Sequence, residues 1–285
     1  MKTLHILLIA ILSSCVQSED EIDSTTEKNE DLIEQPNDPS SSIIEVQSFA
    51  DTLYNSAHLF VALCDNKYQA IAPVPERIGN GQNPKSNLYW GAGYGVKNYF
   101  LNKSSDWELI RSEFIDSTIL ERLILKHREH EFFLIADAYN GKEIYRATLD
   151  FLSSSAGLTK DTLVIRQDTI GIHGNAKMSA YIGHNGLMEF NIFDEFQNSD
   201  SLQRDVIVLA CFSKLFFEPQ LENSNTNKLV WTTGLMAPEA YTFHDAINSY
   251  LNGDSTEQVR TKAAEAYHQY QRCGINGARR LLVSN

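Results

Sequence analysis

The sequence of 285 residues contains few cysteines and no cluster of lysine or arginine. Its four cysteines form no CxxC or other metal-type spacing, and the one glycine-rich stretch, Gly91–Lys97, lacks the strand–GxGxxG–helix setting of a nucleotide-binding loop. The 24 basic residues are outnumbered by 37 acidic ones, which argues against a nucleic-acid-binding surface. The sequence therefore predicts no metal, no organic cofactor and no nucleic-acid partner.

The first apolar run of the chain is too short to cross a bilayer as a helix. Lys2, the apolar run Ile6–Leu12 and two serines have the order of a secretion signal. The residues from Leu12 to Cys15 resemble a bacterial lipobox, which implies that residues 1–14 are a lipoprotein signal peptide and that Cys15 carries lipid. Such a lipid would anchor the protein to a membrane without spanning it. An ordinary signal peptide with an incidental cysteine is the alternative.

Residues 15–41 follow as a strongly acidic segment with few apolar side chains. Between 16 and 41 the chain has nine acidic residues and one lysine, which predicts a flexible tether because so little surface can be buried. The acidic cluster Ser18–Glu21 resembles the surface-export signal of Bacteroidota lipoproteins, although a solvated linker explains the same residues. These resemblances imply an exported protein, lipid-anchored in the outer membrane of a Gram-negative bacterium, with surface exposure if the cluster is such a signal.

Residues 42–285, about 240 residues, suffice for one domain with a full hydrophobic core. Apolar runs predict buried strands at 58–65, 131–138, 178–183, 205–210 and 227–234. Helices are expected at 42–55, 140–152, 238–251 and 255–273. Ser255 and Gln258 form a capping-box pattern for the last helix, and Gly274 is expected to end it. This alternation predicts an α/β fold, a three-layer α/β/α sandwich with a mostly parallel sheet.

Two of the predicted strands end in a chemically reactive side chain. The strand at 178–183 leads into His184, and the strand at 205–210 leads into Cys211, 27 residues further along. Parallel strands present their carboxyl ends at one edge of the sheet, where ligands bind. A histidine there can promote the thiolate or carry its proton, although each residue taken alone is more often a buried structural side chain.

This pair resembles the signature of the caspase-like cysteine peptidases, the group of caspases, metacaspases, legumains and gingipains. In that signature a hydrophobic strand ends in His-Gly and a later one ends in Ala-Cys, which His184 and Ala210-Cys211 match. The run Leu59–Tyr68 also resembles the first strand and turn of that fold. His173, followed directly by glycine, is the alternative histidine, but the strand before it is less apolar.

The chain departs from the signature at the position after the histidine. Asn185 and then Gly186 stand where the family has glycine, so their backbone N–H groups would have to form the oxyanion hole. By family logic, acidic residues in the specificity pocket select arginine or lysine. Asp65 therefore suggests a basic substrate residue, while Asp137 and Glu239 are further pocket candidates that a turn and a helix start explain as well.

The resemblance implies a lipid-anchored cysteine endopeptidase whose partner is a peptide or protein substrate. Cys211 would attack the substrate carbonyl, and His184 would protonate the leaving amine and then activate water. With Cys15 lipidated, Cys64, Cys211 and Cys273 remain, and a Cys64–Cys273 disulfide stays open. The alternative is a catalytically inactive caspase-like envelope lipoprotein that binds a peptide or protein partner in the same cleft.

Overall fold

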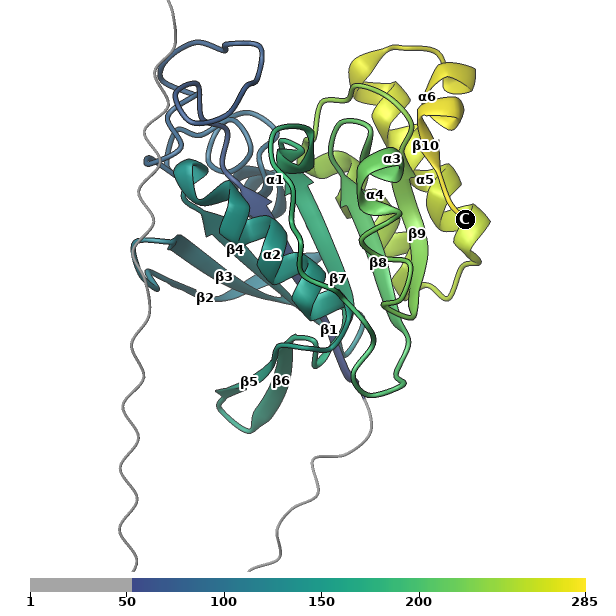
Figure 1. The fold of residues 1–285 in the computed structure, drawn as a ribbon. Coiled ribbons are helices and arrows are strands. Elements are labelled where there is room, and N and C mark those ends of the chain that lie inside the picture. The colour runs from purple at the N-terminus through teal and green to yellow at the C-terminus, as the bar shows by residue number, and fades with distance from the viewer. Residues whose placement is uncertain (1–52) are drawn as a thin grey trace, which may run out of the picture. The chain divides into compact units, whose positions relative to one another are not determined.

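The computed structural model describes residues 53–285, which are built around a sheet of eight strands (Figure 1). Along the sheet the order is β10-β9-β8-β7-β1-β4-β3-β2. The bounds are β1 (Tyr54–Ala62), β2 (Trp107–Glu113), β3 (Ile119–His127), β4 (Phe133–Tyr139), β7 (Ala176–Gly183), β8 (Arg204–Leu209), β9 (Thr226–Thr232) and β10 (Leu282–Val283).

The predicted signal peptide at 1–14, Cys15 and the tether at 15–41 lie outside the described residues, as does most of the helix expected at 42–55. The end of that helix prediction is wrong, because Tyr54 and Asn55 belong to β1. The Tyr54 N–H donates to the Asn175 carbonyl at 3.0 Å, and Tyr54 pairs with Ala176 of β7. Pairing with a neighbouring strand here overrides the helical spacing of the apolar residues.

Five strands, in the order β4-β1-β7-β8-β9, run parallel to one another. In chain order this is 2-1-3-4-5, one of the two common orders of doubly wound α/β sheets. The antiparallel strands β3 and β2 extend one side, and the short antiparallel strand β10 closes the other. The predicted α/β fold with a mostly parallel sheet is confirmed.

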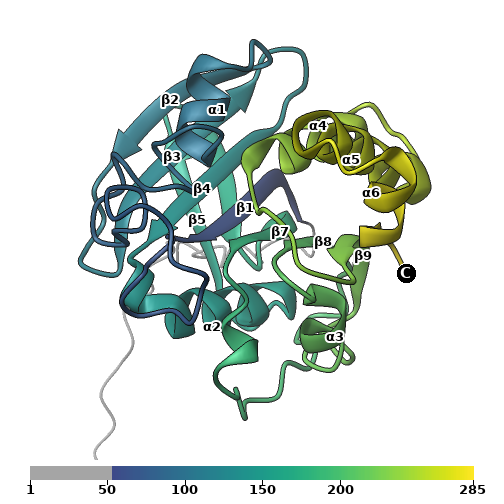
Figure 2. The ribbon, with the colours of Figure 1, turned by 90° about the horizontal axis from the view of Figure 1, so that it is seen from above.

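Helices cover both faces of the sheet (Figure 2), so the arrangement is compatible with the predicted three-layer sandwich. Side chains alternate along β1: Leu59 and Val61 enter the core under α1, α4 and α5, while Phe60 and Ala62 enter the core under α2 and α3. The helices are α1 (Val96–Asn102), α2 (Ile144–Ser155), α3 (Ser213–Phe217), α4 (Ala240–Leu251), α5 (Thr256–Gln271) and α6 (Ile275–Leu281), with short 3-10 turns η1 (Gly141–Glu143) and η2 (Gly186–Met188).

The helix α5 shows how local signals set its ends. Ser255 and Gln258 form the predicted capping box, with both hydrogen bonds present. The helix ends at Gln271, before the predicted stop, because Arg272 takes a left-handed conformation as its C-cap. Gly274, at φ 80°, then starts α6. None of the helices within 53–285 is long and apolar enough to cross a membrane.

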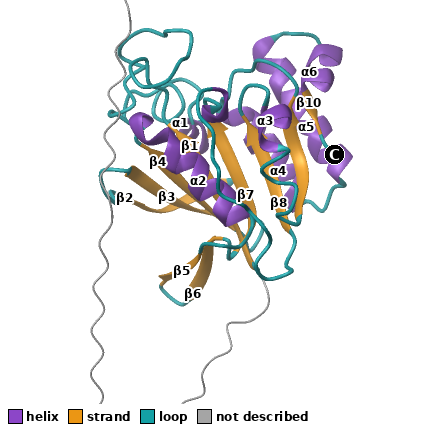
Figure 3. Ribbon diagram, viewed as in Figure 1, coloured by secondary structure: helices purple, strands orange, loops and turns teal. Residues whose placement is uncertain are grey.

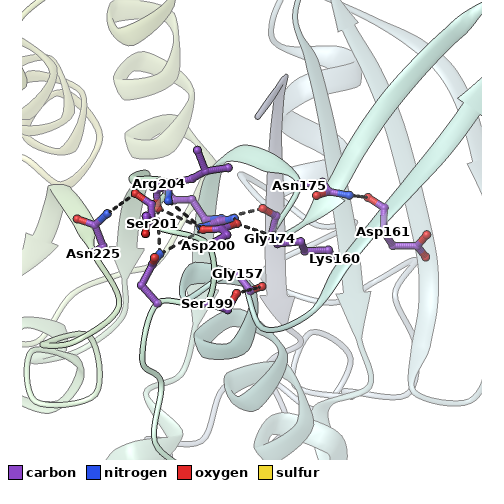
Figure 4. Close-up of polar contacts among 12 residues, drawn as sticks. Gly157, Lys160, Asp161, Gly174, Asn175, Ser199, Asp200, Ser201, Arg204 and Asn225 are labelled. Atoms are coloured by element: carbon purple, nitrogen blue, oxygen red, sulfur yellow. Dashed lines mark hydrogen bonds and ion pairs between the residues drawn. The ribbon is translucent and has the colours of Figure 1, made fainter. Parts of the chain in front are cut away.

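A separate hairpin of β5 (Lys160–Ile165) and β6 (Asp168–His173) precedes β7 and lies below the sheet in Figure 3. Near it, an ion cluster around the buried Arg204 fixes the start of β8 (Figure 4). The Arg204 guanidinium donates to Asp200 at 2.5 Å and to the Gly174 carbonyl at 2.7 Å, and Lys160 also reaches Asp200. Burial raises the pKa of Asp200, but hydrogen bonds from Arg204 and Lys160 outweigh this and keep it below its usual value. These contacts fix the end of the long β7–β8 connection that leads into β8.

Candidate active site

A cavity of about 300 Å³ opens where the carboxyl ends of β1, β7, β8 and β9 meet, at the edge of the sheet that faces the viewer in Figure 2. Both predicted reactive residues, His184 after β7 and Cys211 after β8, line it. The remaining lining residues are Ala70, Ile71, Ala72, Val74, Tyr89, Gly183, Met188, Leu235, Met236 and Pro238. Four strand ends therefore contribute to one site, as the doubly wound topology predicts.

The backbone before His184 requires glycine. Gly183 has a φ of 147°, and a Cβ atom on it would lie 2.7 Å from the carbonyl oxygen of Ala62 in the neighbouring strand. The glycine lets β7 lie against the end of β1 and still turn out of the sheet. The carbonyl of His184 accepts a hydrogen bond from the Tyr181 hydroxyl at 2.8 Å, so the turn that presents the imidazole is held in place.

The His184 imidazole is engaged on one side by a carboxylate. Its Nε2 atom contacts Oε1 of Glu189, which also accepts the N–H of Ala70 at 2.8 Å. Among residues 53–285 no group hydrogen-bonds to Nδ1, so that nitrogen is available for proton transfer. A base whose second nitrogen is held by a third group is the arrangement of an activated nucleophile pair. The sequence analysis does not predict a role for Glu189. The one feature of the sequence that could indicate it is a carboxylate five residues after His184.

Cys211 is half-buried and lies on a tight turn between β8 and α3. The next residue, Phe212, has a left-handed backbone with φ 50°, a strained conformation for a bulky residue. Ser213 stabilises the turn, because its hydroxyl donates a hydrogen bond to the Val208 carbonyl of β8 at 2.8 Å. The sulfur accepts the Met236 N–H at 3.4 Å and points its S–H at the Met236 carbonyl at 3.6 Å. A strained turn after a strand is a common way to expose a nucleophile.

The Asn185 side chain connects the turn after β7, which carries His184, to the turn after β8, which carries Cys211. This buried side chain donates to the Cys211 carbonyl at 2.7 Å and accepts the Leu187 N–H at 3.1 Å. Gly186 starts the 3-10 turn, and a Cβ there would meet the Phe190 ring at 2.4 Å. In the described part of the chain, no backbone acceptor takes the N–H of Asn185, Gly186 or Cys211. These groups are the candidate oxyanion donors of the site.

Asp65 and Glu239, two of the predicted pocket residues, do not line the cavity. Asp65 is buried and accepts hydrogen bonds from the Gln82 side chain at 2.6 Å and from the Lys67 N–H at 2.8 Å, so it holds the turn after β1. Glu239 is the residue before α4, and its carboxylate accepts the Tyr241 hydroxyl at 2.9 Å. Burial raises the pKa of the Glu239 carboxyl.

Asp137 lies inside the domain, away from the cavity. Its carboxylate accepts two hydrogen bonds at 2.6 Å from Arg122, and His58 Nε2 lies 3.0 Å away. Burial alone raises the pKa of Asp137, but the Arg122 guanidinium and His58 outweigh it and hold the pKa well below its usual range. The sequence placed Asp137 at a strand end, whereas β4 continues to Tyr139 and turns the carboxylate into the core.

His173, the alternative histidine, belongs to the same buried network. Its backbone N–H donates to Nδ1 of His58 at 2.9 Å, and its ring bonds the Ser154 hydroxyl at 3.1 Å. Burial, with His58 as a second cause, lowers the pKa of His173 to about 3. Gly174 beside it contacts Arg204 at the start of β8, whereas Cys211 follows the end of that strand. Of the two histidines, only His184 shares a cavity with Cys211.

The three cysteines within 53–285 are free thiols in different surroundings. Cys64 is buried, and burial raises the pKa of its thiol to about 11. Cys273 is exposed and, like Cys64, is a free thiol, which means that the Cys64–Cys273 disulfide that the sequence left open is not formed in the structure. In the same described range, no group of three or more His, Cys, Asp or Glu side chains has the geometry to hold a metal ion.

Comparisons of the chain with protein-family models, curated proteins and solved structures gave no match.

Proposed function

We propose that this protein is a caspase-like cysteine endopeptidase, anchored through a lipidated Cys15 in the outer membrane of a bacterial envelope. The observation that carries the proposal is that His184 and Cys211 line one cavity at the carboxyl edge of a parallel sheet. The strained turn at Phe212 and the carboxylate of Glu189 on the imidazole support it further, because both are devices that ready a nucleophile and its base.

The geometry supports an acyl-enzyme route. The thiol proton of Cys211 passes to Nδ1 of His184, and the sulfur, stabilised by the Met236 N–H, bonds to the substrate carbonyl carbon. The N–H groups of Gly186 and Cys211 stabilise the oxyanion. The carbon–nitrogen bond then breaks, and the amine leaves with the proton from His184. Water, deprotonated by His184, attacks the thioester, which releases the acid and returns the proton to the thiol.

The hydrolysis of peptides by the full chain tests this proposal. We expect Cys211→Ala to abolish peptide hydrolysis and His184→Ala to lower kcat by about 10²–10⁴-fold, the usual contribution of a general acid–base group. Cys273→Ala is the matched control, since this cysteine is exposed and outside the cavity, and it should keep full activity. Hydrolysis that survives Cys211→Ala rules the proposal out.

One observation favours the inactive alternative, a lipoprotein that binds a peptide in the same cavity. Within residues 53–285, the Cys211 sulfur forms hydrogen bonds with Met236 and none with His184. On this account the wild-type chain binds peptide without hydrolysing it, and Cys211→Ser leaves the affinity unchanged. Binding measured by calorimetry, alongside the hydrolysis assay, distinguishes the two functions.

A further inference from the structure

The cavity beside Cys211 and His184 has an apolar wall. Three segments build it: Ile71 and Val74 from the loop after β1, Met188 from η2, and Met236 with Pro238 from the connection after β9. Of residues 53–285, no lysine, arginine, aspartate or glutamate lines the cavity. We propose, building on the function proposed above, that the substrate residue on the acyl side of the scissile bond is apolar, of the size of leucine or methionine.

The position of the cavity makes it the natural site for that residue. A substrate carbonyl within bonding reach of the Cys211 sulfur carries its side chain only two bonds away from the reacting carbon. Because the sulfur and the apolar wall line the same cavity, that side chain enters the space between Ile71, Val74 and Met236. A charged group there would lose its water without gaining a counter-charge, which is strongly unfavourable.

Glu189, a carboxylate in contact with the cavity residue His184, is already occupied and does not serve as a partner for a basic substrate residue. Oε1 of Glu189 contacts His184 and accepts the Ala70 N–H at 2.8 Å. A lysine or arginine that paired with Glu189 would compete with the catalytic imidazole for the same carboxylate. Asp65, the residue that suggested a basic preference, is buried in its own turn and cannot meet the substrate.

The size and rim of the cavity suit an aliphatic side chain rather than a large ligand. Its volume of about 300 Å³ is at the lower end of ligand pockets, enough for one or two side chains rather than a larger molecule. At the rim, Met188 is 42% exposed and Leu235 is 70% exposed. Apolar side chains that line a cavity and remain open to water are typical of surfaces that a partner covers.

The test is kcat/KM of the full chain toward peptides that differ only in the residue before the scissile bond. We expect leucine and methionine to exceed alanine by at least about tenfold, the discrimination that a methylene-sized difference in an apolar pocket provides. Lysine, arginine and aspartate should be cleaved at least about 100-fold more slowly than leucine, because a buried unpaired charge costs more than a missing methylene.

Two variants place a charge in the wall. Ala72→Asp, at an exposed lining position, and Val74→Asp, deeper in the wall, should both lower leucine cleavage and raise lysine cleavage. Val164→Asp is the control, since Val164 is 68% exposed on the separate β5–β6 hairpin. Because Ala72 is exposed, its variant remains informative even where Val74→Asp does not fold.

The outcomes separate this inference from the function on which it rests. Cleavage with a clear preference for a basic or acidic residue overturns the apolar preference and leaves the peptidase proposal standing. The apolar preference is also overturned, with the peptidase proposal left standing, if Ala72→Asp changes the ratio of leucine to lysine cleavage no more than Val164→Asp does. If no peptide in the series is cleaved and Cys211 reacts with none of them, both proposals are refuted.

Discussion

Glu189→Gln is the substitution that most sharply tests how the imidazole is positioned. The glutamine keeps the size of the side chain and an oxygen that can accept the Ala70 N–H, but it removes the negative charge beside His184 Nε2. A hydrogen bond to a charged group contributes about 1.5–3 kcal/mol. At about 1.4 kcal/mol for each factor of ten in rate, kcat should fall by about 10- to 150-fold.

The assay must separate positioning of the base from binding of the substrate. In Glu189→Gln the wall segment at Ala70 stays tethered, so KM should change less than about twofold while kcat falls. In Glu189→Ala the hydrogen bond to Ala70 is lost as well, and KM should rise because Ala70 and the next residue, Ile71, both line the cavity. Steady-state kinetics on one leucine peptide give both constants.

Glu195→Gln is the matched control, because Glu195 is an exposed glutamate in the same connection between β7 and β8. Thermal melts of all three variants confirm that each remains folded. If Glu189→Gln is as active as Glu195→Gln, or if its whole loss lies in KM, then Glu189 does not position His184 and this part of the account is wrong.

Three further predictions concern the rest of the domain. Asp137→Asn should lower the free energy of unfolding by about 3–5 kcal/mol, because it leaves the Arg122 guanidinium buried without a counter-charge; a loss below about 1 kcal/mol in urea melts would contradict this. His173 has a pKa of about 3 in the folded chain against 6.5 as a free group. Between about pH 6.5 and pH 3 the unfolded chain therefore binds a proton on His173 that the folded chain does not, and the free energy of unfolding should fall as the pH drops through this range. His173→Asn, which suits the left-handed backbone at φ 52°, should flatten that dependence of the urea midpoint on pH, and an unchanged slope would refute the argument. Cys64, with a thiol pKa raised to about 11, should resist iodoacetamide at pH 8 until the chain is unfolded, whereas exposed Cys273 should react at once; equal rates in the native protein would overturn the assignment.

The parallel part of the sheet could be predicted from the sequence because its strands are buried on both faces. The runs at 58–65, 131–138, 178–183, 205–210 and 227–234 correspond to β1, β4, β7, β8 and β9. In contrast β2 was missed, since its residues from Trp107 to Glu113 are mostly exposed and polar. A strand of that kind is formed by its pairing with β3, which no local pattern reveals.

The candidate site, too, could be predicted only in part from the sequence. Strand endings pointed to His184 and Cys211, because topology alone brings the ends of neighbouring parallel strands together. The roles of the acidic residues could not be predicted, since they depend on contacts between distant segments. Asp137 of β4 meets Arg122 on the adjacent strand β3, and Glu189 meets the N–H of Ala70, which is 119 residues away.

Covalent trapping tests most directly whether Cys211 and His184 form one reactive pair. The full chain is treated with a leucine peptide that ends in an acyloxymethyl ketone, and the modified residue is mapped by mass spectrometry. We expect a single adduct on Cys211, formed at least about tenfold more slowly in His184→Ala, where no base accepts the thiol proton. An adduct confined to Cys64 or Cys273, or a rate that does not depend on His184, contradicts this expectation.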